Sequence, residues 1–189
     1  MPILGTYASS VQKASGSFES IATAIVGAGG APSVTFNSIP STYKHLQIRA
    51  VSQQDYATGG DFGWVQMRFN GDSGSNYDSH LLQAPYQTGA YAITGISFMY
   101  AFDSFLIPAS NNDSRYAVGI VDVLDYASTS KYKTSRIVGG ANWNGGTGIA
   151  RLTSGLWNST SAISSITLIG SNGNFKENSK FALYGMKGQ

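Results

Sequence analysis

The chain of 189 residues contains no cysteine, which excludes a disulfide framework, a thiolate zinc site and a cysteine nucleophile. Charged residues are also scarce, at 12% against about 25% in typical domains. The formal net charge is +2, and the densest basic group is no more than Lys131, Lys133 and Arg136. Because nucleic-acid-binding proteins cluster Lys and Arg on one face, we expect no nucleic-acid partner.

Long hydrophobic runs are absent as well. No apolar stretch approaches the ~18 residues that a transmembrane helix needs, so we expect no membrane insertion. The N-terminal sequence MPILGTYASSVQKASGS has no charged segment followed by an apolar one, and we therefore expect no signal peptide. Together with the missing cysteine, these features fit a protein that folds in a reducing cytoplasm.

Short apolar runs separated by turn residues make up most of the chain. In YKHLQIRAVS, Leu46, Ile48 and Ala50 alternate with polar residues, which predicts a half-buried strand. About ten such runs follow one another at the spacing of about 8–12 residues that is typical of a sandwich or barrel, and they leave residues 70–95 without a strand. We therefore predict an all-β fold, a single-domain antiparallel β-sandwich over residues 18–189 that is jelly-roll-like, without predicting its strand order.

Residues 1–17 have a different composition and form a separate segment. A few apolar residues lie in a background of Ser, Ala and Gly, namely Ile3, Leu4, Tyr7 and Val11. One interpretation is a frayed terminus. The other is an extended N-terminal arm that becomes ordered against a neighbouring subunit, with the four apolar side chains as its docking interface.

The segment MRFNGDSGSNYDSH contains G-D-S-G around Ser73, the letters that surround the nucleophile of chymotrypsin-like proteases. His45 and either Asp55 or Asp61 would complete a triad in the right chain order. However, Ser73 precedes most of the predicted strands, His45 lies on the outward face of one of them, and Ser75 replaces the last glycine of the motif. We therefore expect no protease, and no catalytic residue elsewhere.

The same segment also has a simpler interpretation. Asn70-Gly71 between apolar runs is a strong hairpin signal, and Asp72 to Asn76 would extend it as a polar turn. Asp72, Asn76 and Asp78 also offer oxygen ligands for calcium, although the EF-hand pattern fails. The sequence leaves open whether this loop binds an ion, and we expect no cofactor and no other metal site.

Other titratable residues give weaker signals. The two histidines, His45 and His80, occur in separate segments without a metal-binding spacing. Four aspartates are candidates for pairing across strands as in glycosidases, namely Asp103, Asp113, Asp122 and Asp125. Asp122 and Asp125 stand in an apolar run, IVDVLDY, where the simpler interpretation is a strand-end aspartate that caps the following turn.

Aromatic residues are abundant, at 12% of the chain. Four of them stand among Gly, Asn, Gln and Thr in expected loops, namely Tyr56, Tyr86, Tyr91 and Trp143. Exposed aromatics of this kind occur in sugar-stacking sites and in protein interfaces. The sequence does not separate these two functions from aromatics that pack under their own loop.

Several segments taken together resemble a family of small virion structural proteins of tailed bacteriophages, notably those of cyanobacteria and marine bacteria. The similarity runs from Ser17 to Gly188, and the segments that carry it are SFESIATAIVGAGGAPSVTFNSIPSTYKHLQIR, MRFNGDSGSNYDSH, IVDVLDYASTSKYKT, SGLWNSTSAISSITL and KFALYGMKG. The resemblance implies a non-enzymatic protein displayed on the particle, as a capsid decoration protein or a tail appendage. It supplies no catalytic residue.

The partners and location that we expect follow from this resemblance. The protein would be made and folded in the cytoplasm of the bacterial host and would end in the virion. It would form a homo-oligomer, for which we expect a trimer, and would contact other capsid or tail proteins. The alternative is a tail-fibre module that recognises host surface glycans through the loop aromatics.

Overall fold

Twelve β-strands and no helix make up the part of the chain that the computed structural model describes, residues 17–56, 62–85, 89–107, 114–142 and 148–188. In chain order the strands are β1 (Phe18–Ile25), β2 (Ser33–Phe36), β3 (His45–Asp55), β4 (Phe62–Phe69), β5 (Tyr77–Pro85), β6 (Gly89–Ile96), β7 (Met99–Ile107), β8 (Ala117–Leu124), β9 (Lys133–Asn142), β10 (Gly148–Trp157), β11 (Ile166–Gly170) and β12 (Lys180–Met186). The all-β prediction is confirmed.

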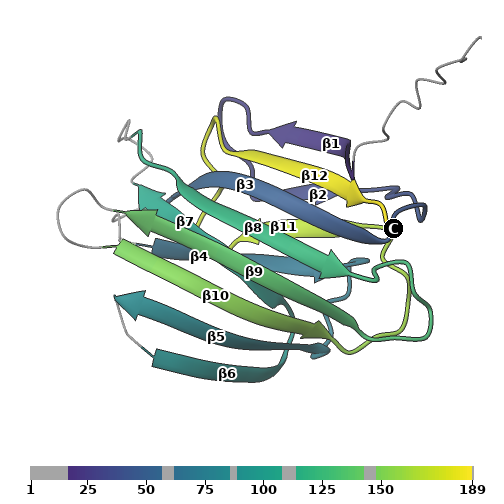
Figure 1. Ribbon diagram of the computed structural model, residues 1–189. Coiled ribbons are helices and arrows are strands. Elements are labelled where there is room, and N and C mark those ends of the chain that lie inside the picture. Colours follow the sequence, from purple (N-terminus) through teal and green to yellow (C-terminus); the bar gives the residue numbers. More distant parts are fainter. Residues whose placement is uncertain (1–16, 57–61, 86–88, 108–113, 143–147, 189) are drawn as a thin grey trace, which may run out of the picture.

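The strands form two sheets that lie one behind the other (Figure 1). The large sheet has the order β1-β12-β3-β8-β9-β10-β5-β6, and all its neighbours are antiparallel. The small sheet has the order β2-β11-β4-β7 and is also antiparallel. The carboxyl end of β3 pairs in parallel with β7, so β3 belongs to both sheets. The predicted β-sandwich is therefore consistent with the structure.

Two finer predictions, the jelly-roll-like architecture and the number of strands, are not confirmed. The jelly-roll-like architecture is not confirmed, because a jelly roll consists of eight strands in two Greek keys, whereas these sheets are uneven in size. The count of about ten strands is too low, since β5 and β6 both fall in the region left without a strand. Their signal is weak because β5 turns Ser79 and Gln83 inward, and β6 consists mainly of small residues.

The main core lies between the two sheets and contains many aromatic side chains. Tyr77, Phe69 and Trp157 form one cluster, with Tyr77 and Trp157 stacked at 17° and 6.3 Å between ring centroids. Phe102 of the small sheet packs directly on the backbone of the large sheet, where a Cβ at Gly119 would lie 2.3 Å from the Phe102 ring. A glycine is therefore required at position 119 for the sheets to approach this closely.

The Asn70-Gly71 turn forms as predicted, but it does not make a hairpin. Both residues have positive φ, 52° and 70°, as an Asn-Gly turn requires. However, β4 before the turn belongs to the small sheet, and β5 after it belongs to the large sheet. The turn therefore carries the chain from one layer of the sandwich to the other, and the hairpin prediction is wrong.

Candidate functional site

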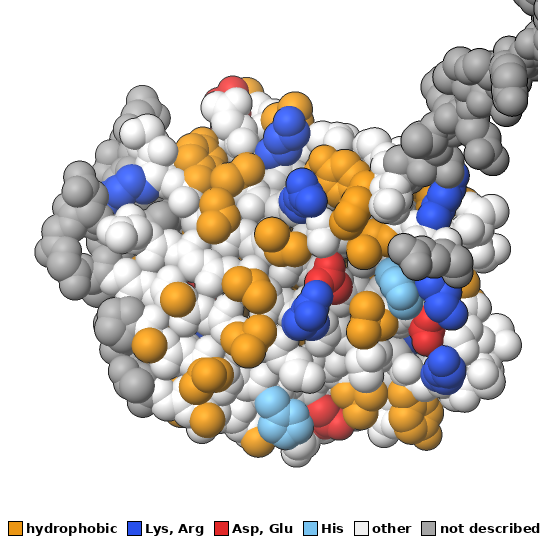
Figure 2. Space-filling view, viewed as in Figure 1, with side chains coloured by type: hydrophobic (Ala, Val, Ile, Leu, Met, Phe, Trp, Pro, Cys, Tyr) orange, Lys and Arg blue, Asp and Glu red, His pale blue; other side chains and the backbone are white. Residues whose placement is uncertain are grey.

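The outer face of the large sheet carries contiguous exposed hydrophobic side chains, which we call the outer patch. It consists of Val51, Leu82, Val118, Ile120, Val138 and Leu152, which are between 36% and 57% exposed. One row of direct cross-strand neighbours is Leu82, Leu152, Val138 and Ile120. The adjacent row is Ala84, Ala150, Gly140, Val118 and Val51. Figure 2 looks onto this face and shows hydrophobic side chains spread over the strands in front.

Charged side chains near the outer patch are held by neighbours of their own. Arg49, next to Ile120, donates to Gln47 at 2.8 Å and lies over the rings of Phe18 and Tyr184. In the next row, Arg136 donates to Asp122 at 2.8 Å. The outer patch covers five strands at about 4.8 Å spacing, so it is about 24 Å wide. Exposed apolar side chains on neighbouring strands, without a charge among them, are a feature of interaction sites.

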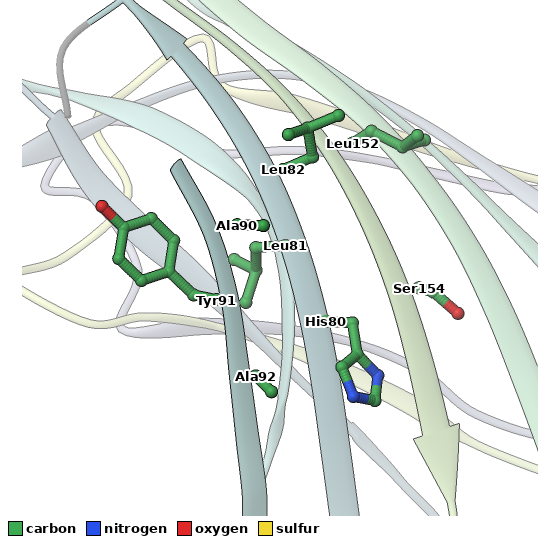
Figure 3. Close-up of a pocket in the computed structure, with 8 residues that line it drawn as sticks. All are labelled: His80, Leu81, Leu82, Ala90, Tyr91, Ala92, Leu152 and Ser154. Carbon is green, nitrogen blue, oxygen red and sulfur yellow. The ribbon is translucent and has the colours of Figure 1, made fainter. Parts of the chain in front are cut away.

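A shallow depression of about 430 Å³ lies at one end of the outer patch, between β6, β5 and β10 (Figure 3). Leu82 and Leu152 line one side of it, and His80 and Ser154 supply its two polar side chains. Tyr91 borders the depression, but its ring points away from Leu82 and Leu152 (Figure 3), and it belongs to strand β6 and not to a loop as we expected from the sequence. The depression therefore extends the apolar surface of the outer patch.

The remaining aromatic candidates do not join Tyr91. Tyr56 is 36% exposed and follows the end of β3. Tyr86 and Trp143 lie outside the residues that the structure describes, as do the arm residues Ile3, Leu4, Tyr7 and Val11. Tyr56, just after β3, and Tyr91, in β6, thus lie in separate segments, and the sequence-based glycan site is not assembled from described residues.

The G-D-S-G segment is organised around Asp72. Its carboxylate accepts hydrogen bonds from the backbone N–H of Gly74 at 2.8 Å, from Asn76 Nδ2 at 2.9 Å and from Trp157 Nε1 at 2.7 Å. Partial burial acts to raise the pKa of Asp72, but the bonds from Trp157, Asn76 and Gly74 outweigh it and the pKa is lowered. Because N–H donors occupy both oxygens, Asp72 acts as the anchor of a polar turn.

Replacing Asp72 with alanine is expected to reduce the free energy of unfolding by about 1–3 kcal/mol, because the buried Trp157 N–H loses its acceptor. Ser73→Ala is the matched control, since Ser73 is exposed in the same turn and surface changes stay within about 0.5 kcal/mol. Urea denaturation of both variants measures the difference. Equal losses would contradict the anchoring role of Asp72.

The structure separates the residues of the protease triad. His45 and Asp55 are the first and last residues of β3, so they lie about 33 Å apart at about 3.3 Å per residue. His45 Nδ1 accepts a hydrogen bond from the backbone N–H of Asp125 at 3.0 Å. Asp61 lies outside the described residues. No triad can therefore form with Asp55.

The aspartates proposed as a glycosidase pair also have separate environments. Asp122 is on the outer face of the large sheet and binds Arg136, whereas Asp103 is buried between the sheets. Asp125 follows β8 in a turn, and hydrogen bonds from Lys131 and Lys44 lower its pKa to about 2. Asp113 lies outside the described residues. Asp125 thus lies in a strand-end turn, as the simpler interpretation predicted, but its carboxylate pairs with Lys44 and Lys131, and Asp122 lies within β8.

One charged cluster between the sheets was missed by the sequence analysis. The Arg151 guanidinium donates to Asp103 Oδ1 at 2.5 Å and to Gln83 Oε1 at 2.6 and 3.0 Å, and it lies 4.1 Å from the centroid of the Trp64 ring. Both charged side chains are nearly inaccessible, at 4% and 2% exposed. Burial raises the pKa of Asp103 to about 6, although Arg151 opposes the shift. The cluster joins β10, β7, β5 and β4 inside the sandwich.

The basic residues that are adjacent in sequence diverge in the fold. Lys131 pairs with Asp125, and Arg136 pairs with Asp122 on the outer face. Lys133 is fully buried and donates to the backbone oxygens of Lys131 and Thr160 at 2.7 and 3.1 Å. These three side chains therefore form no common basic surface.

Comparisons with known proteins found no relative of this chain. The chain matches no protein-family model, no curated protein and no solved structure. Over the described ranges, no group of three or more His, Cys, Asp or Glu side chains is placed to hold a metal ion. In the same ranges, no helix is long and apolar enough to cross a bilayer. The outer patch remains the best candidate for a functional surface.

Proposed function

We propose that this protein is a non-enzymatic structural protein of a tailed-phage virion and that it assembles through the outer patch. The observation that carries the proposal is the uncharged apolar surface across β3, β8, β9, β10 and β5. Such a surface favours burial against another protein, because burying it releases water from apolar side chains without removing charges from solvent.

The virion setting of the proposal comes from the sequence resemblance, and the oligomer from the way virion proteins assemble. Repeated identical contacts between copies are how such proteins build symmetric particles. A low charge content and a polar, neutral surface are compatible with dense packing of copies. The trimer, the contact with capsid or tail proteins and the folding in the bacterial cytoplasm remain parts of this proposal.

Immunogold labelling of purified particles tests the location. Gold over the head would support a decoration protein, and gold on the tail or its fibres would support an appendage. No gold on any particle, with an epitope shown to be accessible by dot blot on disrupted particles, would contradict the virion proposal.

A charge placed in the outer patch tests the assembly role. Leu152→Lys is expected to lower incorporation into particles about tenfold or more, because desolvating a lysine costs more than about 1.4 kcal/mol at an apolar interface. Tyr132→Lys is the control, since Tyr132 is also exposed, at 55%, but lies outside the patch. Incorporation is measured by blotting gradient-purified particles after complementation, with unfolding midpoints checked for both variants. Equal incorporation of both would contradict the role of the patch.

The second candidate is a module that binds host glycans, and the depression beside the outer patch, with His80 and Ser154 on it, is the observation that favours it. It has less support, because only His80 and Ser154 provide polar side chains there, and sugar sites need several. Saturable binding to host cells that His80→Ala abolishes would favour this candidate over the structural role.

A further inference from the structure

Within the described residues, the strand order ends at the edge strands β1, β2 and β6. A free edge presents unpaired N–H and C=O groups that pair with another strand unless something protects them. On β1, Glu19 forms an ion pair with Lys187. The edge at β2 is only four residues long and follows Pro32. Charge, short length and proline are the usual means of protecting an edge.

The β6 edge has none of these protections. Its eight residues, GAYAITGI, include no charge and no proline. Its one irregularity is a bulge near its end, where Gly95 has a φ of 63°. Ahead of the bulge, the five residues from Gly89 to Ile93 pair in regular register with β5. These five residues therefore form a regular and uncharged edge strand of the described sheet.

We propose that β6 pairs antiparallel with β6 of a second copy of this chain around a two-fold axis. Such a contact places the same strand on both sides, so any charge in it would face a like charge. The uncharged sequence of β6 meets this condition. The two-fold axis must be perpendicular to the sheet. It passes midway between one residue of β6 and the same residue of the partner subunit's β6. Centring it on Tyr91 pairs the whole segment from Gly89 to Ile93, with Ala90 opposite Ala92 of the partner subunit.

The outer patch gives a reason for the second copy to be the partner. Ala90 on β6 lies beside Leu82, so the apolar surface continues up to this edge. A two-fold axis perpendicular to the sheet keeps both outer faces on the same side. The joined sheet therefore carries one apolar surface across twelve strands, because β6 of each copy lies between the two patches, and it is about 58 Å wide at the strand spacing used above. This wider surface would be available to a third protein.

This inference specifies one contact within the homo-oligomer of the proposed function. It therefore rests on the proposal that the chain forms a homo-oligomer, but not on the proposed virion location. A two-fold contact generates even-numbered assemblies. It agrees with a dimer, or with two trimers joined by two-fold axes, and it disagrees with an isolated trimer. Failure of the pairing and failure of the virion proposal are therefore separate results.

Cysteine cross-linking tests the pairing, because the chain has no cysteine of its own. Facing residues of antiparallel strands have Cα atoms about 4.5–5.5 Å apart, which suits a disulfide. Tyr91→Cys is expected to form a covalent dimer under mild oxidation, and a mixture of Ala90→Cys and Ala92→Cys is expected to cross-link with each other. Thr23→Cys on the β1 edge is the matched control, and Val138→Cys reports on contact through the outer patch.

Sedimentation equilibrium of the unmodified chain gives the second readout. A mass of an even multiple of 20.0 kDa, with cross-linking within β6 at least tenfold faster than for Thr23→Cys, would support the pairing. Self-cross-linking of Ala90→Cys or Ala92→Cys instead of Tyr91→Cys would support it with a register shifted by two residues. A monomer or an isolated trimer, or fastest cross-linking at Val138→Cys or Thr23→Cys, would overturn it.

Discussion

Replacing Arg151 with methionine is expected to lower the free energy of unfolding by about 3–5 kcal/mol. The change removes the partner of Asp103 Oδ1 and both donors to Gln83 Oε1, while the Asp103 carboxylate stays buried between the sheets. An unpaired buried charge is costly because the interior screens it poorly. Chemical denaturation near pH 8, followed by tryptophan fluorescence, measures the loss.

Arg136→Met is the matched control, because Arg136 pairs with Asp122 on the outer face and its side chain is 72% exposed. Exposed ion pairs contribute about 0–1 kcal/mol, so this variant should lose no more than that. If the two variants lost the same amount, the buried cluster would not hold the two sheets together as its geometry indicates.

The loss in Arg151→Met should also depend on pH. Burial raises the pKa of Asp103 to about 6 in the native state, so the native state binds a proton more readily than the unfolded chain and gains stability as pH falls from about 6 towards 4. Without Arg151 the carboxyl pKa rises further, and the gain begins at a higher pH. The difference in the free energy of unfolding between the unmodified protein and Arg151→Met should therefore be smaller at pH 5 than at pH 8. A difference that stays constant would contradict this role of Asp103.

The second large effect is expected at Trp157, whose replacement by alanine should cost about 3–5 kcal/mol. The side chain is 2% exposed, stacks on Tyr77 and contacts Phe69, and its Nε1 donates to Asp72. Removing the Trp157 side chain leaves a cavity in the aromatic cluster. It also leaves the Asp72 carboxylate without the hydrogen bond from Trp157 Nε1. Thermal and urea unfolding measure the change in stability.

Trp157→Phe separates the two contributions, because it keeps a ring in the cluster and removes only the Nε1 donor. It should lose about 1–3 kcal/mol, less than alanine. The cluster would be shown to matter little if alanine and phenylalanine were equally destabilising.

The sequence predicts the fold class of this protein well but the arrangement of its strands poorly. Alternation in YKHLQIRAVS is strong because Leu46, Ile48 and Ala50 all face the core. In β5 the inward positions include Ser79 and Gln83, so the apolar alternation on which the prediction relies is missing. Pairing of β3 with β7 depends on contacts between distant segments, which no local pattern encodes.

The candidate surfaces were the least predictable part. Leu152 and Val138 look like core residues in sequence, and only the position of their strands in the large sheet shows that they face outward. Arg151 gives no signal either, because its partners Asp103 and Gln83 are 48 and 68 residues away in the chain. The turn at Asp125 was predictable, since a turn following a strand needs only neighbouring residues, but its pairing with the distant Lys44 was not.

The position of β12 in the strand order affects how the protein emerges from the ribosome. β12 pairs with both β1 and β3, although β3 ends 125 residues before β12 begins, counting from Asp55 to Lys180. At about 5–20 residues per second, the ribosome takes roughly 6–25 s to synthesise that interval. During this time β1 has no partner and β3 presents an open edge. A chaperone that binds extended strands has that interval in which to protect each new chain.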